Sequence, residues 1–354
     1  MSANIGSDLT TPLSDRRSRI LSFIVEDYVA SAQPVGSKAL VSNHELDLSS
    51  ATVRNEMAAL EDAGMVTHPH TSAGRIPSDA GYRYYVTSLM TEHELTRQEQ
   101  FTILHQFHQS ARELENWLGL ATSVLAQSVH SLALATQPHQ DQVRLKQIQL
   151  VSLTDERALL VVVTNDAAVH QHTIEFENVI DQSQLSQLAD QINRRLSGKG
   201  AADFPTPPDE GRYADIQAKI ERAVSSMLLT EATQSRDAPI VEGVRDLLRK
   251  PEYEDIDRML DTIEAVDAKH LHAAIPAEEM STSDVMVVIG DENEDGPYRS
   301  MSFVLTRYGP SNGTGGTIGV LGPTRMDYSD TVAHVRYVSE VLTELMQGFY
   351  GESD

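Results

Sequence analysis

The stretch SSATVRNEMAALEDAGMVTHPHTSAGRIPSDAGYR, residues 49–83, decides the fold of this chain. Ser49 or Ser50 can cap the N-terminus of a helix, and Gly64 supplies the left-handed residue that ends it. Between these signals the apolar positions recur at helical spacing and form one buried stripe: Val53, Met57 and Leu60. The stretch therefore begins with a capped amphipathic helix.

The outer face of this helix is short and polar near its N-terminus. It carries Ser50, Thr52, Arg54, Asn55 and Ala58. Arginine suits the O6 and N7 atoms of guanine, asparagine suits the N6 and N7 atoms of adenine, and small side chains allow close approach. The pattern is typical of a helix that reads the major groove, although an ordinary amphipathic surface helix has a similar composition.

The surroundings of the helix favour DNA binding. A helical run over 15–30, a turn at 33–36 and a short helix from Ser37 to Asn43 precede it, as in a helix-turn-helix. A strand over 65–68, a basic tip at 71–75 and a return at Ile76 follow it, and these make a wing. We therefore predict a winged helix-turn-helix domain over 15–90, with these DNA-binding residues: Lys38, Ser50, Thr52, Arg54, Asn55 and Arg75.

Five longer runs carry a family resemblance. They are PVGSKAL at 34–40, SSATVRNEMAALEDAG at 49–64, HTSAGRIPSDAGYRYYV at 70–86, VRDLLRKPEYEDIDRML at 244–260 and GTIGVLGPTRMDY at 316–328. These runs resemble the HrcA-type heat-inducible transcription repressors of bacteria, over nearly the whole chain. The resemblance implies a homodimer that binds an inverted-repeat operator in double-stranded DNA upstream of class I heat-shock (chaperone) genes. It also implies that the GroE chaperonin keeps the repressor active.

The chain beyond the wing alternates between helical and strand patterns. A seven-residue apolar repeat predicts a long helix over 92–134, either laid against a sheet or forming a coiled coil. Strands are expected at 144–151, 158–163 and 170–176, and again at 285–289, 303–306 and 317–321, with a helix over 185–196 and a final helix over 328–347. The Pro- and Gly-rich segment 198–210 is expected to be a linker, and 213–279 to be helical.

Together these patterns and the resemblance predict an α+β fold in which a GAF-like domain carries a helical dimerisation insert. The expected boundaries are a disordered leader at 1–14, the winged helix at 15–90, the first half of the GAF-like domain at 91–197, the insert at 198–282 and the second half at 283–350. The segment Ile216–Leu271 is the candidate dimer interface, with the apolar repeat as the alternative.

The net charge of −24 needs explanation in a DNA-binding protein. Through residue 85 there are seven Lys and Arg against ten Asp and Glu, which leaves −21 for the remaining 269 residues. The acidity therefore belongs mainly to the body, which would repel DNA from its other faces. We expect modest affinity and marked salt dependence.

The composition of the chain argues against several other classes of protein and of site. The chain has no cysteine, which excludes disulfides, thiolate zinc sites and a cysteine nucleophile. No apolar run is long enough to span a membrane, and residues 1–14 lack the features of a signal peptide, so we expect a cytoplasmic protein. The thirteen histidines include close pairs but no recognisable metal spacing, and Gly313–Gly316 lacks the continuation of a phosphate-binding loop.

We therefore expect no cofactor, no metal and no enzyme activity. Two alternatives to an operator-binding repressor stay open. One is a winged-helix regulator gated by a small effector in the GAF-like domain, and the other is a protein-interaction module in which the winged helix serves only for docking.

Overall fold

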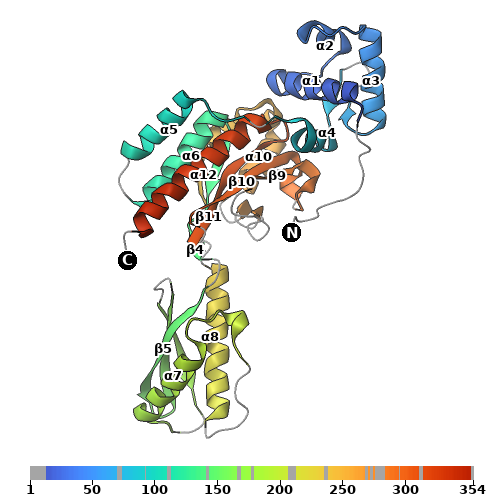
Figure 1. Cartoon of the computed structure of the whole chain (residues 1–354). Coiled ribbons are helices and arrows are strands. Elements are labelled where there is room, and N and C mark those ends of the chain that lie inside the picture. The colour runs from blue at the N-terminus through green and yellow to red at the C-terminus, as the bar shows by residue number, and fades with distance from the viewer. Residues whose placement is uncertain are drawn as a thin grey trace. The chain divides into compact units, whose positions relative to one another are not determined.

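The computed structural model describes residues 13–69, 74–91, 93–109, 113–140, 143–165, 169–176, 179–205, 213–234, 238–267, 270–271, 274–275, 284–294, 296–310 and 314–351. The fold is mixed α/β (Figure 1). The chain divides into two compact units. Unit 1 comprises Met1–Thr136, Ala238–Tyr308 and Thr317–Asp354, and unit 2 comprises Gln137–Asp237 and Gly309–Gly316.

The first ninety residues form a helical module with a short ribbon. Ser14 and Ser49 accept backbone hydrogen bonds as N-caps, and Gly64, at φ 73°, follows the third helix. The predicted stripe of that helix is buried, as expected. The elements are α1 (Asp15–Ser31), α2 (Ser37–Asn43), α3 (Ser50–Asp62), β1 (Val66–Thr67), β2 (Ile76–Pro77), α4 (Asp79–Tyr84) and the π-helical turn η1 (Tyr85–Leu89). Most of the predicted leader (1–12) and the wing tip (71–73) lie outside the described residues.

The body of unit 1 is built on an antiparallel sheet in the order β8-β3-β11-β10-β9. Its strands are β3 (Leu132–Ala135), β8 (Ile240–Glu242), β9 (Met286–Ile289), β10 (Met301–Tyr308) and β11 (Thr314–Pro323). The short β4 (His139–Gln140) pairs with the start of β11, in the part of that strand that belongs to unit 2. β3 lies between strands more than 100 residues later in the chain, so the sheet is completed by long-range pairing.

Helices cover both faces of this sheet. Three lie together on one face (Figure 1): α5 (Arg97–Gln109), α6 (Leu114–Val129) and α12 (Tyr328–Gly351). Shorter elements pack on the other: α9 (Val244–Leu248), η3 (Pro251–Tyr253), α10 (Ile256–Ala265) and η6 (Gly296–Ser300), while η5 (Gly290–Glu292) follows β9. Val304 of β10 faces the first group and Phe303 faces the second, as alternation along a strand requires.

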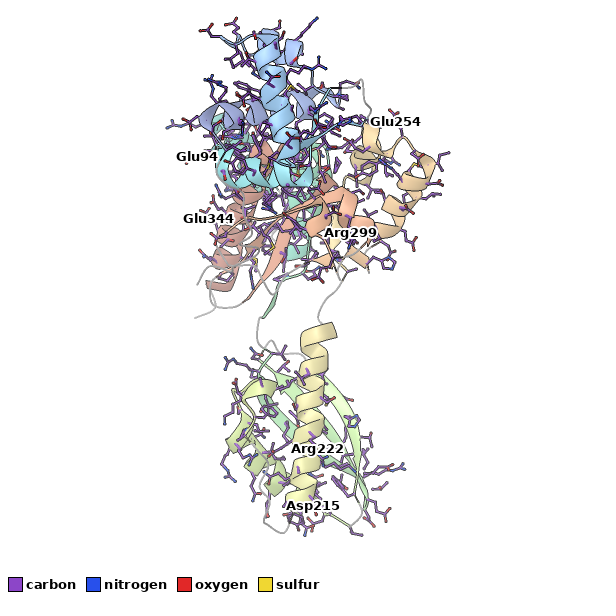
Figure 2. The ribbon with its side chains drawn as sticks, turned by 90° about the vertical axis from the view of Figure 1, so that its right-hand side faces the viewer. Glu94, Asp215, Arg222, Glu254, Arg299 and Glu344 are labelled. Carbon is purple, nitrogen blue, oxygen red and sulfur yellow. The ribbon has the colours of Figure 1, made fainter. Side chains whose placement is uncertain are left out.

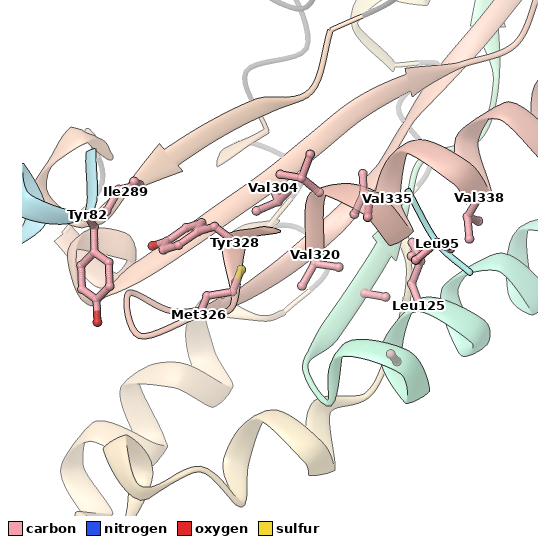
Figure 3. Packing of buried hydrophobic residues seen from close by; sticks show 14 of the residues in the cluster. Tyr82, Leu95, Leu125, Ile289, Val304, Val320, Met326, Tyr328, Val335 and Val338 are labelled. Atoms are coloured by element: carbon pink, nitrogen blue, oxygen red, sulfur yellow. The ribbon is translucent and has the colours of Figure 1, made fainter. Parts of the chain in front are cut away.

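The apolar core continues from this sheet to the N-terminal helices. Tyr82 of α4 packs on Tyr328 of α12, with 5.7 Å between ring centroids, and Met326 lies beside them (Figure 3). Tyr82 and Tyr328 are each 1 % exposed. The N-terminal module and the body therefore share one core.

Unit 2 is a three-stranded antiparallel sheet with helices on one face. The strands β5 (Leu145–Thr154), β6 (Arg157–Thr164) and β7 (Val169–Glu175) follow one another in space as in sequence. The apolar face of α7 (Gln182–Leu196), which opens with a capping box at Asp181 and Gln184, packs on them. The turn η2 (Ala201–Asp203) and α8 (Ala214–Gln234), which carries Asp215 and Arg222 (Figure 2), complete the unit.

The observed division of the chain differs from the predicted boundaries. The predicted GAF-like halves end at 197 and resume at 283, whereas unit 1 is interrupted from 137 to 237. Residues 240–267 of the predicted insert thus belong with unit 1, and strands β5–β7 do not. The reason lies in β3 and β8, short apolar strands that pair with each other and hold the two edges of the interruption together.

Two predicted elements also differ. The long helix over 92–134 is two helices, α5 and α6, and its last residues form β3. The predicted linker at 198–210 begins inside unit 2, where Gly200 bridges Arg144, while 206–210 lie outside the described residues. The repeat is nevertheless a sheet-facing surface, because Phe107, Leu118 and Leu125 are buried.

Candidate nucleic-acid interface

The N-terminal turn of α3 is held by its cap. The Ser49 Oγ accepts a hydrogen bond from the Thr52 backbone N–H at 3.1 Å and lies 2.9 Å from the Thr52 hydroxyl. Thr52 and Ser50 are both half-buried. The Thr52 hydroxyl therefore takes part in the cap, and its methyl group and the small Ser50 form a low surface there.

Arg54 and Asn55 project from the next turn of α3. Both are exposed, and within the described ranges no hydrogen bond or ion pair engages either side chain. The nearby carboxylate of Glu61 binds His68 and Arg75 instead. The guanidinium and amide groups, which suit guanine and adenine edges, are thus available to a ligand.

Lys38 lies on the neighbouring helix. It is exposed in the first turn of α2, whose Leu40 is buried in the core of the module. α2 packs against α3, so the Lys38 ammonium lies on the helix next to the candidate reading helix. This position suits a contact to a DNA phosphate.

The β1–β2 ribbon, the predicted wing, is anchored to the helices by the backbone of Arg75 and by its side chain. Val35 and Arg75 exchange backbone hydrogen bonds of 2.8 and 2.9 Å. The Arg75 Nη2 lies 2.5 Å from the Glu61 Oε2, and the His68 imidazole binds the other oxygen of the same carboxylate. Arg75 is 24 % exposed, and its Nε is buried without a hydrogen-bond partner in the described part of the chain.

Arg75, the arginine of the predicted basic tip at 71–75, is thus paired with a carboxylate of α3. Glu61 at the end of α3 binds His68, which follows β1, and Arg75, which precedes β2. Desolvation alone would raise the pKa of the Glu61 carboxyl, but His68 and Arg75 hold it below its usual range. The role of Arg75 at DNA stays a prediction, and its observed contact is the ion pair with Glu61 of α3.

Two further arginines border α3 and were not predicted as site residues. Arg17 Nε donates to the Glu56 Oε2 at 2.9 Å, and Arg16 Nη1 lies 3.4 Å from the Glu56 Oε1. The hydrogen bond from Arg17 is the main reason that the pKa of Glu56 is lowered. Arg16 is 56 % exposed, so the start of α1 places a cation beside the helix that carries Arg54. The sequence offered only two arginines in a first helical turn, and Glu56 cannot be linked to them without the tertiary fold.

The body of the chain resembles a known family. The family model described as the HrcA protein C-terminal domain matches residues 115–332, from α6 into α12. The chain belongs to the HrcA family. Among full-length HrcA relatives, the heat-inducible transcription repressor HrcA of Roseiflexus castenholzii is 37 % identical, with 97 % of each chain covered. That of Herpetosiphon aurantiacus is 36 % identical, with 96 % of this chain and 97 % of the relative covered.

A solved structure supports the same fold. A protein described as hypothetical, with a crystal structure at 2.2 Å resolution, matches with a TM-score of 0.55 and 20 % identity, over 95 % of this chain and 98 % of the other. The HrcA family model does not include the candidate interface at 15–90, whereas the full-length relatives do.

Other kinds of site find no support in the described ranges. No group of three or more His, Cys, Asp or Glu residues there could hold a metal ion. No helix of the described chain is both long and apolar enough to cross a membrane. The HrcA relatives are named as repressors of transcription, not as enzymes.

Proposed function

We propose that this chain represses transcription by binding DNA through a winged-helix domain at residues 15–90. The observation that carries the proposal is the outer face of α3, where Arg54 and Asn55 are exposed and without partners among the described residues. A helix with free arginine and asparagine side chains, next to a ribbon fixed as a wing, has the form of a major-groove reader. Membership of the HrcA family supports heat-shock chaperone genes as the target.

Charge supports the same assignment. The first 85 residues carry only −3 of the total of −24. Lys38, Arg54 and Arg16 are exposed cations on α2, α3 and α1, and Glu56 and Glu61 are engaged by arginines. The potential of this module is therefore less negative than that of the body, which favours DNA contact through this end of the chain.

We propose further that the repressor is a homodimer on an inverted repeat, because one such module buries too little surface for operator-grade specificity. The predicted interface at 216–271 is divided between the two units, which weakens it as one surface. A better candidate is the face of the β5–β7 sheet that no described element of unit 2 covers. It carries half-exposed Leu159, Val161 and Val163 on the central strand, with exposed Val151 and Val169 on its neighbours.

Dependence on the GroE chaperonin is the regulatory part of the proposal, and the body of unit 1 is proposed to be GAF-like. Its sheet pairs β3 with β11, strands separated by about 180 residues, so folding must close long-range contacts. Apolar strands of this sheet such as β9 are exposed until that happens, and a chaperonin captures such segments. Refolding the denatured chain with and without chaperonin, and measuring operator binding per mole, tests this: complete yield without chaperonin at growth and heat-shock temperatures contradicts it.

The experiment that tests DNA reading compares four variants on the footprinted operator and on random DNA. Arg54→Ala and Asn55→Ala should each weaken operator binding by ~1–3 kcal/mol and relax base preference. Lys38→Ala should weaken binding to both DNAs and reduce the salt slope by about one unit. Arg222→Ala, an exposed arginine on α8 of unit 2 (Figure 2), is the matched control and should change neither. Equal losses on the two DNAs for Arg54→Ala and Asn55→Ala would contradict base reading.

A further inference from the structure

Arg325 connects the body of unit 1 to the N-terminal module. It lies between β11 and α12, and its Nη1 donates to the Val29 carbonyl oxygen at 2.6 Å, in the last turn of α1. The last carbonyls of a helix lack partners within the helix and attract positive charge. α1 has no basic residue of its own in its last turn. Arg325 therefore supplies a cation from a distant part of the chain.

The same guanidinium is held by Glu252 of η3. The Arg325 Nε lies 2.5 Å from the Glu252 Oε1, and its Nη2 lies 3.3 Å from the Oε2. The two side chains are 13 % and 24 % exposed. Burial alone would lower the pKa of Arg325, but the hydrogen bond and charge of Glu252 raise it. Removing one partner of such a half-buried pair leaves the other charge uncompensated.

This contact joins two of the five family runs, both of which lie outside the predicted DNA-binding domain. Glu252 lies in the run at 244–260 and Arg325 in the run at 316–328. They meet on α1 of the proposed DNA-binding domain. Both runs thus contribute to attaching that domain.

A second contact lies at α4. The Arg83 Nε donates to the Glu292 Oε1 at 2.6 Å, its Nη2 donates to the Val287 carbonyl at 2.6 Å, and Nη2 also binds the second oxygen of Glu292. The Asp79 carboxylate accepts a hydrogen bond of 3.0 Å from the Asp291 backbone N–H. Arg325 and Arg83 thus attach two different helices of the N-terminal module, α1 and α4, to two different segments of the body.

We propose that Arg325 and Arg83 are positioning residues for operator binding, which together fix the direction of α3 relative to the body. This proposal rests on the proposed function. In a dimer held by other parts of the chain, the attachment of each DNA-binding domain sets the distance between the two reading helices. Rigid attachment favours one spacing of half-sites, whereas a loosened attachment accepts several spacings with lower affinity for each.

The contacts themselves leave the reading face untouched. Arg325 meets α1 and Arg83 extends from α4, while Arg54 and Asn55 on α3 contact neither. Binding of a single half-site should therefore survive loss of the contacts. Retained half-site binding therefore distinguishes a positioning role from a general loss of structure.

The experiment uses the full-length chain and the inverted repeat found by footprinting on its own promoter region. Binding is measured to a single half-site and to repeats whose spacer is lengthened stepwise by one to about five base pairs, half a helical turn. The variants are Arg83→Glu, Glu292→Arg and the double exchange, with Arg299→Ala as the control. Arg299 is an exposed arginine of η6 in the same unit (Figure 2).

The wild type and Arg299→Ala should prefer one spacer. Arg83→Glu and Glu292→Arg should each reduce the preference on the order of tenfold, with half-site binding within about twofold of the wild type, and the double exchange should restore part of it. Glu252→Gln, which keeps the shape of the half-buried pair, should act in the same direction as Arg83→Glu. Thermal unfolding of each variant verifies that it is folded.

An unchanged spacer preference in Arg83→Glu and Glu252→Gln overturns the positioning role, as does a proportional loss on half-site and full operator. If the wild type binds neither half-site nor any repeat above random DNA, the proposed function fails and the positioning role fails with it. The two failures are therefore distinguishable.

Discussion

The sheets of the two units bury apolar side chains in different ways. Strand β10 of unit 1 is buried on both faces, because α6 and α12 cover one side and α9, α10 and η6 cover the other. Strand β6 of unit 2 alternates between buried and half-exposed residues, because α7 and α8 cover one side only. Yet β6 is apolar on both faces. A sheet covered on both faces leaves no apolar face exposed. An apolar sheet face that stays open is suited to binding another protein surface.

The largest expected effect is in the covered sheet. A Cβ at Gly319 of β11 would lie 2.1 Å from the Val304 carbonyl oxygen, so Gly319→Ala must displace backbone. We expect the free energy of unfolding to fall by about 3 kcal/mol or more in urea titrations. The matched control is Gly119→Ala in α6, where the added Cβ meets no atom within 4 Å beyond the adjacent residues and backbone of its own helix. This variant should raise the free energy of unfolding by ~0.5–1 kcal/mol. Equal effects at the two positions would show that the covered sheet can accommodate the added methyl group.

The open sheet should respond in assembly and not in folding. Val161→Lys places a charge in the middle of the uncovered face, and we expect the dimer dissociation constant to rise on the order of 100-fold, or ~2.8 kcal/mol. Sedimentation across a concentration series measures this. Gln187→Lys, at an exposed position of α7, adds the same charge on the covered side and should leave the dimer intact. A dimer unaffected by Val161→Lys would place the interface elsewhere.

A smaller effect is expected from a buried hydroxyl of α12 that contacts the covered sheet. The Tyr328 hydroxyl lies 2.8 Å from the Ser302 hydroxyl and donates to the Thr324 carbonyl at 2.8 Å. Tyr328→Phe leaves these groups short of a partner, so we expect a loss of ~1–2 kcal/mol by thermal or urea unfolding. Tyr337→Phe removes a 3.2 Å hydrogen bond to the Gln100 carbonyl oxygen at a half-buried site, and it should lower the free energy of unfolding by less. The reverse order would mean that burial does not set the difference.

The smallest effect is expected on the open face. Arg157 Nη2 and Glu175 Oε1 are 2.8 Å apart, but the side chains are 58 % and 66 % exposed. Arg157→Ala should change the free energy of unfolding by less than ~0.5 kcal/mol, and by less still at high salt. A loss above ~1 kcal/mol together with a weaker dimer would put this ion pair inside the interface.

Much of the N-terminal module follows from local signals. The Ser49 cap, the stripe with Val53 and the positive φ of Gly64 each depend on residues within one or two helical turns, and each is as expected. Strand β6 was predictable for a similar reason, because a run of apolar β-branched residues favours a strand in any context.

The failures concern elements that need distant partners. β3, with the sequence LALA, continues a helical pattern, and only its pairing with β11 and β8 makes it a strand. The same holds for the candidate site. The exposure of Arg54 follows from helical periodicity, but the pairing of Arg75 with Glu61 depends on how the ribbon folds back.

The pairing of β3 with β8 gives the segment from 137 to 237, the larger part of unit 2, the character of a removable cassette. Ala135 and Ile240 are neighbours in the ladder, although about 100 residues separate them in the chain. The segment from 137 to 237 thus leaves and re-enters the body between two adjacent strands. A single genetic insertion or excision there changes the length of the protein without breaking the sheet order of unit 1, so the body and the cassette can diverge at different rates.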